Sequence, residues 1–264
     1  MTFLVRAAIC AALIGACGVL PAAADDNLGR PAIAVGNWSG LYVGLQGGIG
    51  SGRGSFTHLS DSAAVGPFQP VGQGGSINSL QGGFAGGQLG FQQQSGRIVY
   101  GIEAGVVSAN IAKTAQNPFF PGLPIDDRFK IGSVATLVGR LGYGGDKWLA
   151  YVKAGYAGGS TNYTGRCLQG AGCGPADFSL DISNWNNGVT VGGGIDFKLA
   201  SNWTLGADYS FVHLNTTSGS SIYHGTGLPP PTITAVYNTK ADAHLFGLRL
   251  NYMFGSEPAP VSLK

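Results

Sequence analysis

The stretch Ile98-Val99-Tyr100-Gly101-Ile102-Glu103-Ala104-Gly105-Val106 decides the fold. Even positions carry isoleucine, tyrosine, alanine and valine, whereas odd positions carry valine, two glycines and Glu103. Side chains of a β-strand alternate between its two faces, so a pattern of period two predicts a strand with one large apolar face. The opposite face holds small residues and a single carboxylate. Such a strand fits a structure whose apolar face is turned toward an apolar solvent.

The same alternation recurs seven more times along the chain, so eight strands are expected. The other segments are residues 40–49, 83–92, 129–143, 148–156, 189–197, 203–211 and 246–254. Beyond residue 24, no stretch approaches the roughly 18 to 20 uninterrupted apolar residues of a membrane-spanning helix. The sequence therefore predicts an all-β fold, an eight-stranded antiparallel transmembrane β-barrel with OmpA-like architecture.

The composition agrees with a chain that lipid surrounds. Of 264 residues, 46 are glycine and 11% are charged, against about 7% glycine and about 25% charge in an average chain. A soluble β-sandwich or lipocalin-like barrel is the alternative, but it would turn its large apolar parity inward. Here the parity opposite the apolar one is glycine with isolated charges, so we favour the membrane barrel. The net charge of +2 is small and the basic residues are scattered, so no nucleic-acid or anionic-lipid patch is expected.

The chain begins with the features of an export signal. Arg6 precedes an apolar stretch at residues 7–20, and Ala22-Ala23-Ala24 offers an A-x-A cleavage site. Cleavage after Ala24 is predicted, with a lipoprotein signal at Cys17 as the alternative. The expected organisation is a signal peptide at 1–24, a periplasmic linker at 25–37, the barrel at 38–254 and a C-terminal tail at 255–264.

The connections between the expected strands alternate in length. Short turns are predicted at residues 92–97, 144–147 and 199–202, and long loops at residues 51–81, 111–128, 160–184 and 215–241. Outer-membrane barrels combine short periplasmic turns with long external loops. One long loop contains Cys167 and Cys173, and an isolated pair of thiols in an exported loop predicts a disulfide.

The inward-facing positions of the expected strands hold equal numbers of acidic and basic residues. They are Glu103, Arg140, Lys153, Asp196, Asp208 and Arg249, with Lys130 and Lys198 near the ends. Eight strands enclose a lumen only just wide enough for side chains, so these charges must pair. We favour an ion-pair plug, and the selectivity filter of a narrow pore is the alternative.

No enzymatic activity, cofactor or metal site is expected. The sequence lacks the common hydrolase, metalloprotease and phosphate-binding motifs. His213 near Ser210 and His244 near Asp242 lie close to strand ends without a third partner, which favours a titrating surface histidine over a general base. The four histidines are scattered, which disfavours a metal site.

Several segments resemble the small alphaproteobacterial outer-membrane proteins that are often called outer membrane immunogenic proteins, or porin-family β-barrel domain proteins. The resemblance lies in Trp38-Ser39-Gly40-Leu41-Tyr42-Val43-Gly44, in residues 82–90, 100–103, 139–143, 151–157 and 202–209, and in the closing residues 248–254. It covers essentially the whole mature chain and implies an envelope protein without enzymatic activity. This chain departs from the family pattern in the tail after Phe254 and in Asp208, where relatives often have glutamate.

We therefore expect a structural surface protein in the outer membrane of a Gram-negative bacterium. It would contribute to envelope integrity and display four external loops. A narrow porin for small solutes and a loop-mediated adhesin or ligand-binding protein are the alternatives. The expected partners are outer-membrane lipid and lipopolysaccharide, the outer-membrane assembly machinery, and host or extracellular ligands of the loops.

Overall fold

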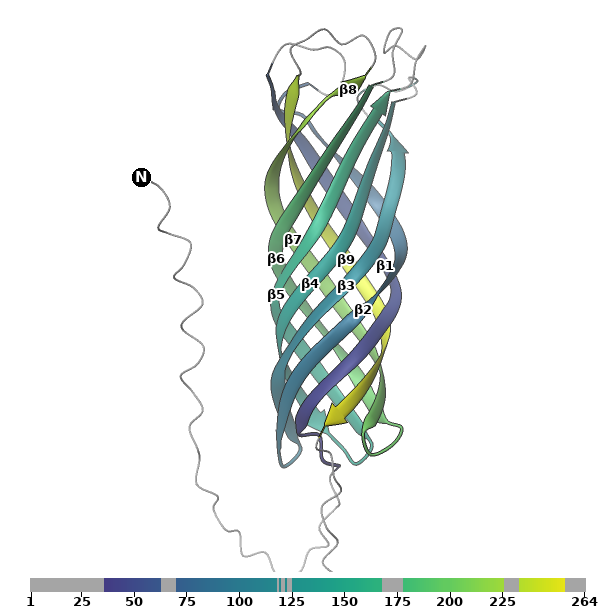
Figure 1. Ribbon diagram of the computed structural model, residues 1–264, viewed down its shortest axis with the longest axis vertical. Helices are drawn as coiled ribbons and strands as arrows, with labels where there is room; N and C mark the ends of the chain where they lie inside the picture. Colours follow the sequence, from purple (N-terminus) through teal and green to yellow (C-terminus); the bar gives the residue numbers. More distant parts are fainter. Residues whose placement is uncertain are drawn as a thin grey trace, which may run out of the picture. The chain divides into compact units, whose positions relative to one another are not determined.

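In the computed structural model, long antiparallel strands close into a barrel (Figure 1). The structure describes residues 36–62, 70–117, 119, 122, 125–167, 178–225 and 233–254. Its strands are β1 (Gly40–Asp61), β2 (Gly74–Ser95), β3 (Ile98–Gln116), β4 (Ile125–Gly144), β5 (Trp148–Cys167), β6 (Phe178–Lys198), β7 (Trp203–Ile222), the two-residue β8 (His224–Gly225) and β9 (Thr234–Phe254). Within these ranges, no helix is long and apolar enough to cross a membrane.

The eight long strands pair in a ring. Each pairs with its neighbours in sequence from β1 to β7, β7 pairs with β9, and β9 returns to β1. The closing pair runs from Leu41 opposite Phe254 to Asp61 opposite Ala235. The short β8 only extends the edge of β6. The predicted eight-stranded antiparallel barrel is thus confirmed.

The two ends of the barrel differ. At one end, three turns of two to four residues join β2 to β3, β4 to β5 and β6 to β7, as predicted. The chain also enters β1 and leaves β9 at this end. We call it the short-turn end, and the opposite end the long-strand end. The four connections at the long-strand end are much shorter than predicted, because most residues expected in loops belong to the strands.

The strands are about twice as long as a membrane requires. The eight long strands contain 19 to 22 residues, whereas a membrane-spanning strand needs about 9–11. Twenty residues tilted by about 40° rise roughly 50 Å, against an apolar band of about 25 Å. The barrel wall therefore extends well beyond any bilayer that it spans.

The half of the barrel near the short-turn end has an apolar outer wall. Its exposed side chains include Leu41, Val43, Leu45, Ile49, Leu89, Phe91, Ile98, Tyr100, Ile102, Val106, Leu137, Leu141, Val152, Val189, Val191, Leu205, Phe246, Leu248 and Leu250. Tyr143, Trp148, Trp203 and Phe254 are exposed near the short turns, where interfacial aromatic residues are common. This wall matches the lipid-facing band that the alternation predicts.

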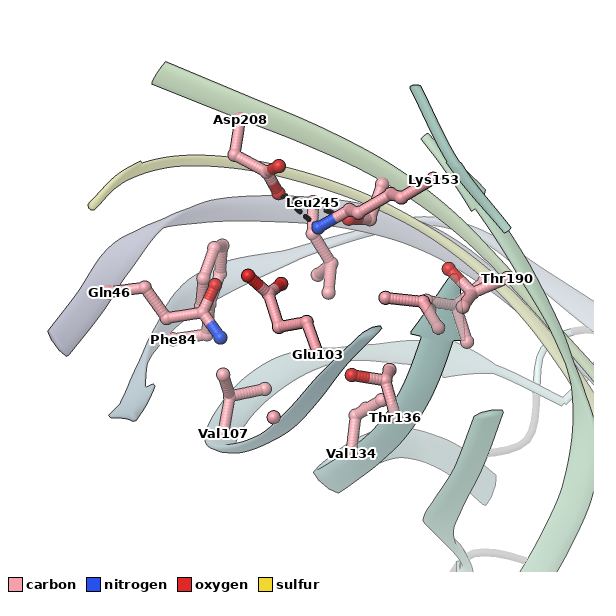
Figure 2. A pocket seen from close by; sticks show the side chains of 14 residues that line it. Gln46, Phe84, Glu103, Val107, Val134, Thr136, Lys153, Thr190, Asp208 and Leu245 are labelled. Atoms are coloured by element: carbon pink, nitrogen blue, oxygen red, sulfur yellow. Dashed lines mark hydrogen bonds and ion pairs between the residues drawn. The ribbon is translucent and has the colours of Figure 1, made fainter. Parts of the chain in front are cut away.

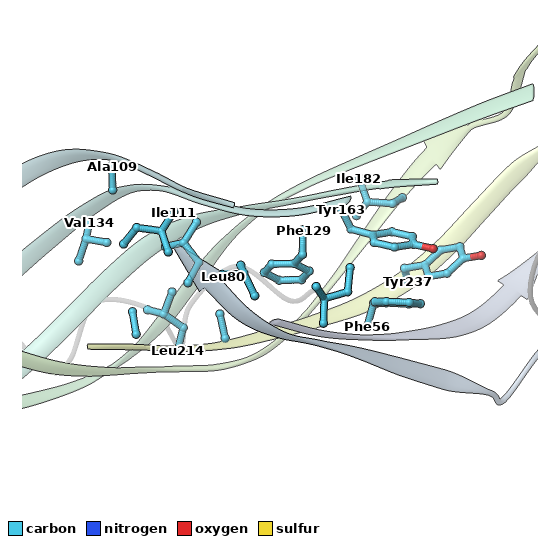
Figure 3. Close-up of a cluster of buried hydrophobic side chains, with 14 of the residues drawn as sticks. Phe56, Leu80, Ala109, Ile111, Phe129, Val134, Tyr163, Ile182, Leu214 and Tyr237 are labelled. Carbon is cyan, nitrogen blue, oxygen red and sulfur yellow. The ribbon is translucent and has the colours of Figure 1, made fainter. Parts of the chain in front are cut away.

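In the other half, the apolar side chains turn inward and form a core (Figure 3). Phe56, Leu80, Ile111, Phe129 and Ile131 are essentially fully buried in it. The alternation in residues 129–143 puts Phe129 and Ile131 on the same parity as Leu137 and so predicts that they face lipid, and this prediction is wrong. The pairing of β4 with β5 shifts between Ile131 and Val134, and such a β-bulge exchanges the two faces of a strand.

Candidate functional site

The structure places the six candidate charges inside the half of the barrel near the short turns. Glu103, Arg140, Lys153, Asp196, Asp208 and Arg249 come one each from β3, β4, β5, β6, β7 and β9. All six side chains are less than a tenth exposed. Each of the six lies at a position of its strand whose side chain faces inward. Six separate strands thus contribute one residue each to a single cluster.

Two arginines connect the acids. Arg140 contacts Glu103 Oε2 at 3.1 Å through Nη1 and Asp196 Oδ2 at 3.0 Å through Nη2. Arg249 donates a hydrogen bond to Glu103, and its Nε lies 3.7 Å from Asp196 Oδ1. Lys153 completes the set with a 2.7 Å contact to Asp208. Three cations thus neutralise three carboxylates, as buried charges require.

Two tyrosines, which sequence reasoning missed as members of the cluster, bridge its charges. Tyr42 donates to Glu103 Oε2 at 2.7 Å and accepts from Arg140. Tyr151 donates to Asp208 Oδ2 at 2.8 Å and accepts from Arg249. The Arg140 guanidinium also lies 3.8 Å from the centroid of the Tyr151 ring. The inward parity of both tyrosines was visible in the sequence and was the available signal.

A polar layer lies between this cluster and the short-turn end. Gln88 donates to Asn251 Oδ1 at 2.7 Å, and Asn251 donates to Thr204 Oγ1 at 3.1 Å. Gln92 donates to the Trp38 carbonyl at 2.7 Å. The Trp38 ring is fully buried, and the Lys198 ammonium lies 4.9 Å from it. These side chains fill the mouth of the barrel.

Between the charges and the apolar core lies one small cavity (Figure 2). Its volume is about 30 Å³, and Glu103, Lys153 and Asp208 line it on one side, with Val107 and Val134 on the other. A space of this size accommodates one or two water molecules. Along the described residues, the interior is therefore filled by a polar plug, then this cavity, then the apolar core.

The apolar core contains one buried carboxyl group. Asp127 is 1% exposed, and it accepts a hydrogen bond of 2.9 Å from the Tyr163 hydroxyl. Tyr163 stacks on Phe56 with ring centroids 4.1 Å apart. Burial raises the pKa of Asp127 to about 6, because low-dielectric surroundings disfavour the carboxylate.

The candidate histidines of β7 and β9 lie on the outer wall. His213 Nδ1 is 2.5 Å from Asp242 Oδ1, and His244 Nδ1 is 2.9 Å from the Tyr209 hydroxyl. Ser210, expected near His213, is inward and donates to Asp208. Among the described residues, no group of three His, Cys, Asp or Glu side chains has metal-binding geometry.

Some candidate features lie outside the described residues. Cys167 is buried at the end of β5, but Cys173 is not among the described residues, so the disulfide stays a prediction. The same holds for the signal peptide at 1–24, most of the linker at 25–37 and the tail at 255–264.

Comparisons with known proteins agree with this architecture. The model of the outer membrane protein beta-barrel domain family matches residues 9–254. The 31 kDa outer-membrane immunogenic proteins of Brucella melitensis and Brucella suis are each 24% identical to this chain over 225 residues, which cover 83% of this chain and 84% of the relative. The solved structure of the outer membrane protease OmpT from Escherichia coli matches with a TM-score of 0.51 at 9% identity, covering 81% of this chain and 97% of that one. This last likeness concerns the fold alone.

Proposed function

Because this chain belongs to the outer membrane protein beta-barrel domain family, we propose that it is a non-catalytic protein that stabilises the outer membrane and presents its long-strand end outside the cell. The observation that carries the proposal is the closure of the barrel at two levels. Arg249 and its ion-pair partners fill one level, and Phe129 with the apolar core fills the other. A barrel filled in this way supports a structural role rather than transport.

The orientation and the route to the membrane are part of the proposal. Short turns and both chain ends of the barrel lie at one end, which is the periplasmic arrangement of bacterial barrels. Export would use the signal peptide at residues 1–24, and insertion would use the outer-membrane assembly machinery. The apolar band would contact lipid, and the polar wall above it would contact lipopolysaccharide.

The absence of catalysis rests on the histidine surroundings. His213 pairs with Asp242 and His244 with Tyr209. Ser51 lies opposite His244 across β1 and β9, but among the described residues no serine hydroxyl forms a hydrogen bond with either histidine, as an activated nucleophile would. Protease activity belongs to OmpT, and a fold shared at 9% identity does not carry an activity to this chain.

Conductance separates the structural role from a narrow pore. We expect the purified, folded protein to give no steady channel in a planar lipid bilayer. The variant Phe129→Ala serves as the matched comparison, because it opens the apolar core while leaving the ion pairs intact. A reproducible open channel from the wild type would overturn the closed-barrel proposal.

Envelope integrity is tested in cells. A deletion strain should become more sensitive to detergent and to large antibiotics, and the plasmid-borne wild type should restore resistance. The plasmid-borne variant His213→Gln should restore the resistance of the deletion strain equally well, because that side chain has no catalytic role here. Unchanged sensitivity of the deletion strain would remove the main support for the structural role.

A further inference from the structure

Three basic side chains gather on the outer wall of the barrel near its long-strand end. They are Arg128 and Lys130 of β4 and Arg166 of β5, and we call this surface the basic wall. Arg128 and Arg166 are exposed, and Lys130 is half-buried. In the sequence these residues look scattered, and Lys130 was predicted near the lumen. The antiparallel register of β4 with β5 brings them to one outer face.

The register makes the three side chains close neighbours. Arg128 lies opposite Thr114 of β3 and Thr164 of β5, and Lys130 lies opposite Asn162. Side chains directly across an antiparallel pair are about 4.5–5.5 Å apart at Cβ, and those two positions apart on a strand share its face. The resulting surface is concave, with a volume of about 370 Å³. Its lining is Thr114, Asp126, Arg128, Lys130, Asn162, Thr164 and Arg166.

The charges of the basic wall are not neutralised from within the described residues. None of its three cations forms an ion pair or a side-chain hydrogen bond there, although Arg166 lies across from Asp126 in the register. Asp126 is the only acid in the lining, so three cations and one acid leave a charge of +2, and Asp181, which accepts a hydrogen bond from Thr164, borders the lining. Like charges at this spacing repel one another. An anionic ligand would relieve that repulsion.

The height of the basic wall above the apolar band indicates what it meets. On β4, the band ends near Leu137, whereas Arg128 lies nine positions further along the strand. Nine residues of a strand tilted by about 40° correspond to roughly 20 Å. The wall thus lies above the acyl chains, at the level of the sugars of surface glycolipids and of soluble glycans.

We propose that the basic wall binds an anionic saccharide, one that carries phosphate or sulfate groups. Arg128 and Arg166 match the planar geometry of two anionic oxygens, and Lys130 acts as a point charge. Asn162 and Thr164 lie between them in the lining. Asn162 donates to Ser183 and Thr164 to Asp181, which leaves their side-chain oxygens to accept hydrogen bonds from sugar hydroxyls. The ligand is either the phosphorylated sugar region of lipopolysaccharide in the same membrane or a free sulfated glycan.

The first experiment measures binding in micelles of a zwitterionic detergent. Folded wild type is titrated with a heparin-derived hexasaccharide, and with maltohexaose as the uncharged probe. We expect binding of the sulfated probe alone, weakening as salt rises. Arg128→Gln/Arg166→Gln should weaken the affinity about tenfold or more.

The matched control is Arg53→Gln/Lys240→Gln. It removes the same two charges from β1 and β9 on another part of the wall, and it should change affinity less than about twofold. Heat-modifiable gel migration checks that each variant is folded. The proposal is overturned if the wild type fails to bind at low salt, or if both variants weaken equally, since net charge alone would then explain binding.

A second arm separates the two sources. Fluorescent lipopolysaccharide and its chemically dephosphorylated form are compared for capture by the wild type and by Arg128→Gln/Arg166→Gln. If the wild type captures lipopolysaccharide but not its dephosphorylated form, and the variant captures neither, the ligand is the membrane glycolipid. Binding of the sulfated hexasaccharide without such capture identifies a free glycan.

The site also rests on the proposed orientation, because only that orientation brings the wall to the cell surface. The two proposals nevertheless fail separately. The micelle assay does not depend on orientation or on closure of the lumen, and a conducting channel would leave the basic wall unaffected.

Discussion

Ile49 and Phe56 belong to the same strand, β1, and their side chains meet opposite surroundings. Ile49 is 71% exposed on the outer wall, whereas Phe56 is 2% exposed in the core. Between them, Arg53 and Ser55 replace apolar residues on the outer face. The barrel is therefore inverted along its axis. One half shows apolar residues outward, and the other half buries them as a water-soluble barrel does.

This inversion predicts that a charge has different costs at two outward positions of β1. Leu45, in the middle of the apolar band, is 70% exposed, and Leu45→Lys should destabilise the protein by about 2–4 kcal/mol in lipid. Thr57→Lys, beyond the band and opposite the uncharged Asn238, should change stability by less than about 0.5 kcal/mol. Urea unfolding in lipid vesicles, followed by gel mobility, measures both. Equal costs at the two positions would refute the assigned band.

The inversion also explains what the sequence revealed. The eight strands were predicted from alternating positions with apolar side chains facing outward. This pattern stops where the barrel wall leaves the lipid. Beyond Ile49 the strand continues, but its outward residues are polar and its inward residue Phe56 is apolar. A search for outward apolar residues classifies such serine- and glycine-rich continuations as loops. The inward apolar set of Phe129, Tyr163 and Tyr237 was the signal that these segments are strands.

The interior charges were predictable because parity alone assigns a side chain to the lumen. The partners of each charge were not, because pairing depends on the stagger between strands. The sequence could not tell that Arg140 reaches both Glu103 and Asp196. The basic wall was missed for the same reason, since Arg128 and Arg166 meet only through the register of β4 with β5.

The pairing of Arg249 with Glu103 predicts strong coupling in a double-mutant cycle. Arg249→Met leaves the buried Glu103 carboxylate with fewer cations and should cost about 3–5 kcal/mol. Adding Glu103→Gln to that variant removes the uncompensated charge, so the double variant should be more stable than Arg249→Met alone. Equilibrium unfolding of the four proteins gives the coupling energy. Additive costs would show that the two side chains act independently.

Asp127 predicts a pH dependence of stability. Its pKa is about 6 in the folded protein against 3.8 for an ordinary aspartate, so the folded state binds the proton more tightly. This group's contribution to stability is present in full below about pH 4 and is lost as pH rises through about 6. The loss amounts to at most about 3 kcal/mol. Unfolding between pH 4 and 7.5 should show it in the wild type.

The matched pair for this test is Asp127→Asn and Asp126→Asn. Asp126 is the exposed neighbour of Asp127 on β4, so its variant should keep the pH dependence, whereas Asp127→Asn should flatten it. A wild-type pH profile that Asp127→Asn leaves unchanged would place the titrating group elsewhere.

Glycine on the two faces of the wall has two different consequences. A Cβ atom at Gly206, on the inner face, would lie 2.0 Å from Asp196 Oδ1 and 2.7 Å from the Ile195 carbonyl oxygen. Gly206→Ala should therefore displace the Asp196 carboxylate from its arginine partners and cost about 1–3 kcal/mol. At Gly139, on the outer face, the nearest atom to such a Cβ is 3.9 Å away. Gly139→Ala should be neutral or stabilise by up to about 1 kcal/mol, because it reduces the freedom of the unfolded chain. Urea unfolding in the same vesicles compares the two alanines. If only Gly206→Ala lowers the free energy of unfolding, the ion-pair plug needs its inward glycines for space. If both substitutions change that free energy equally, glycine serves only the curvature of the strands.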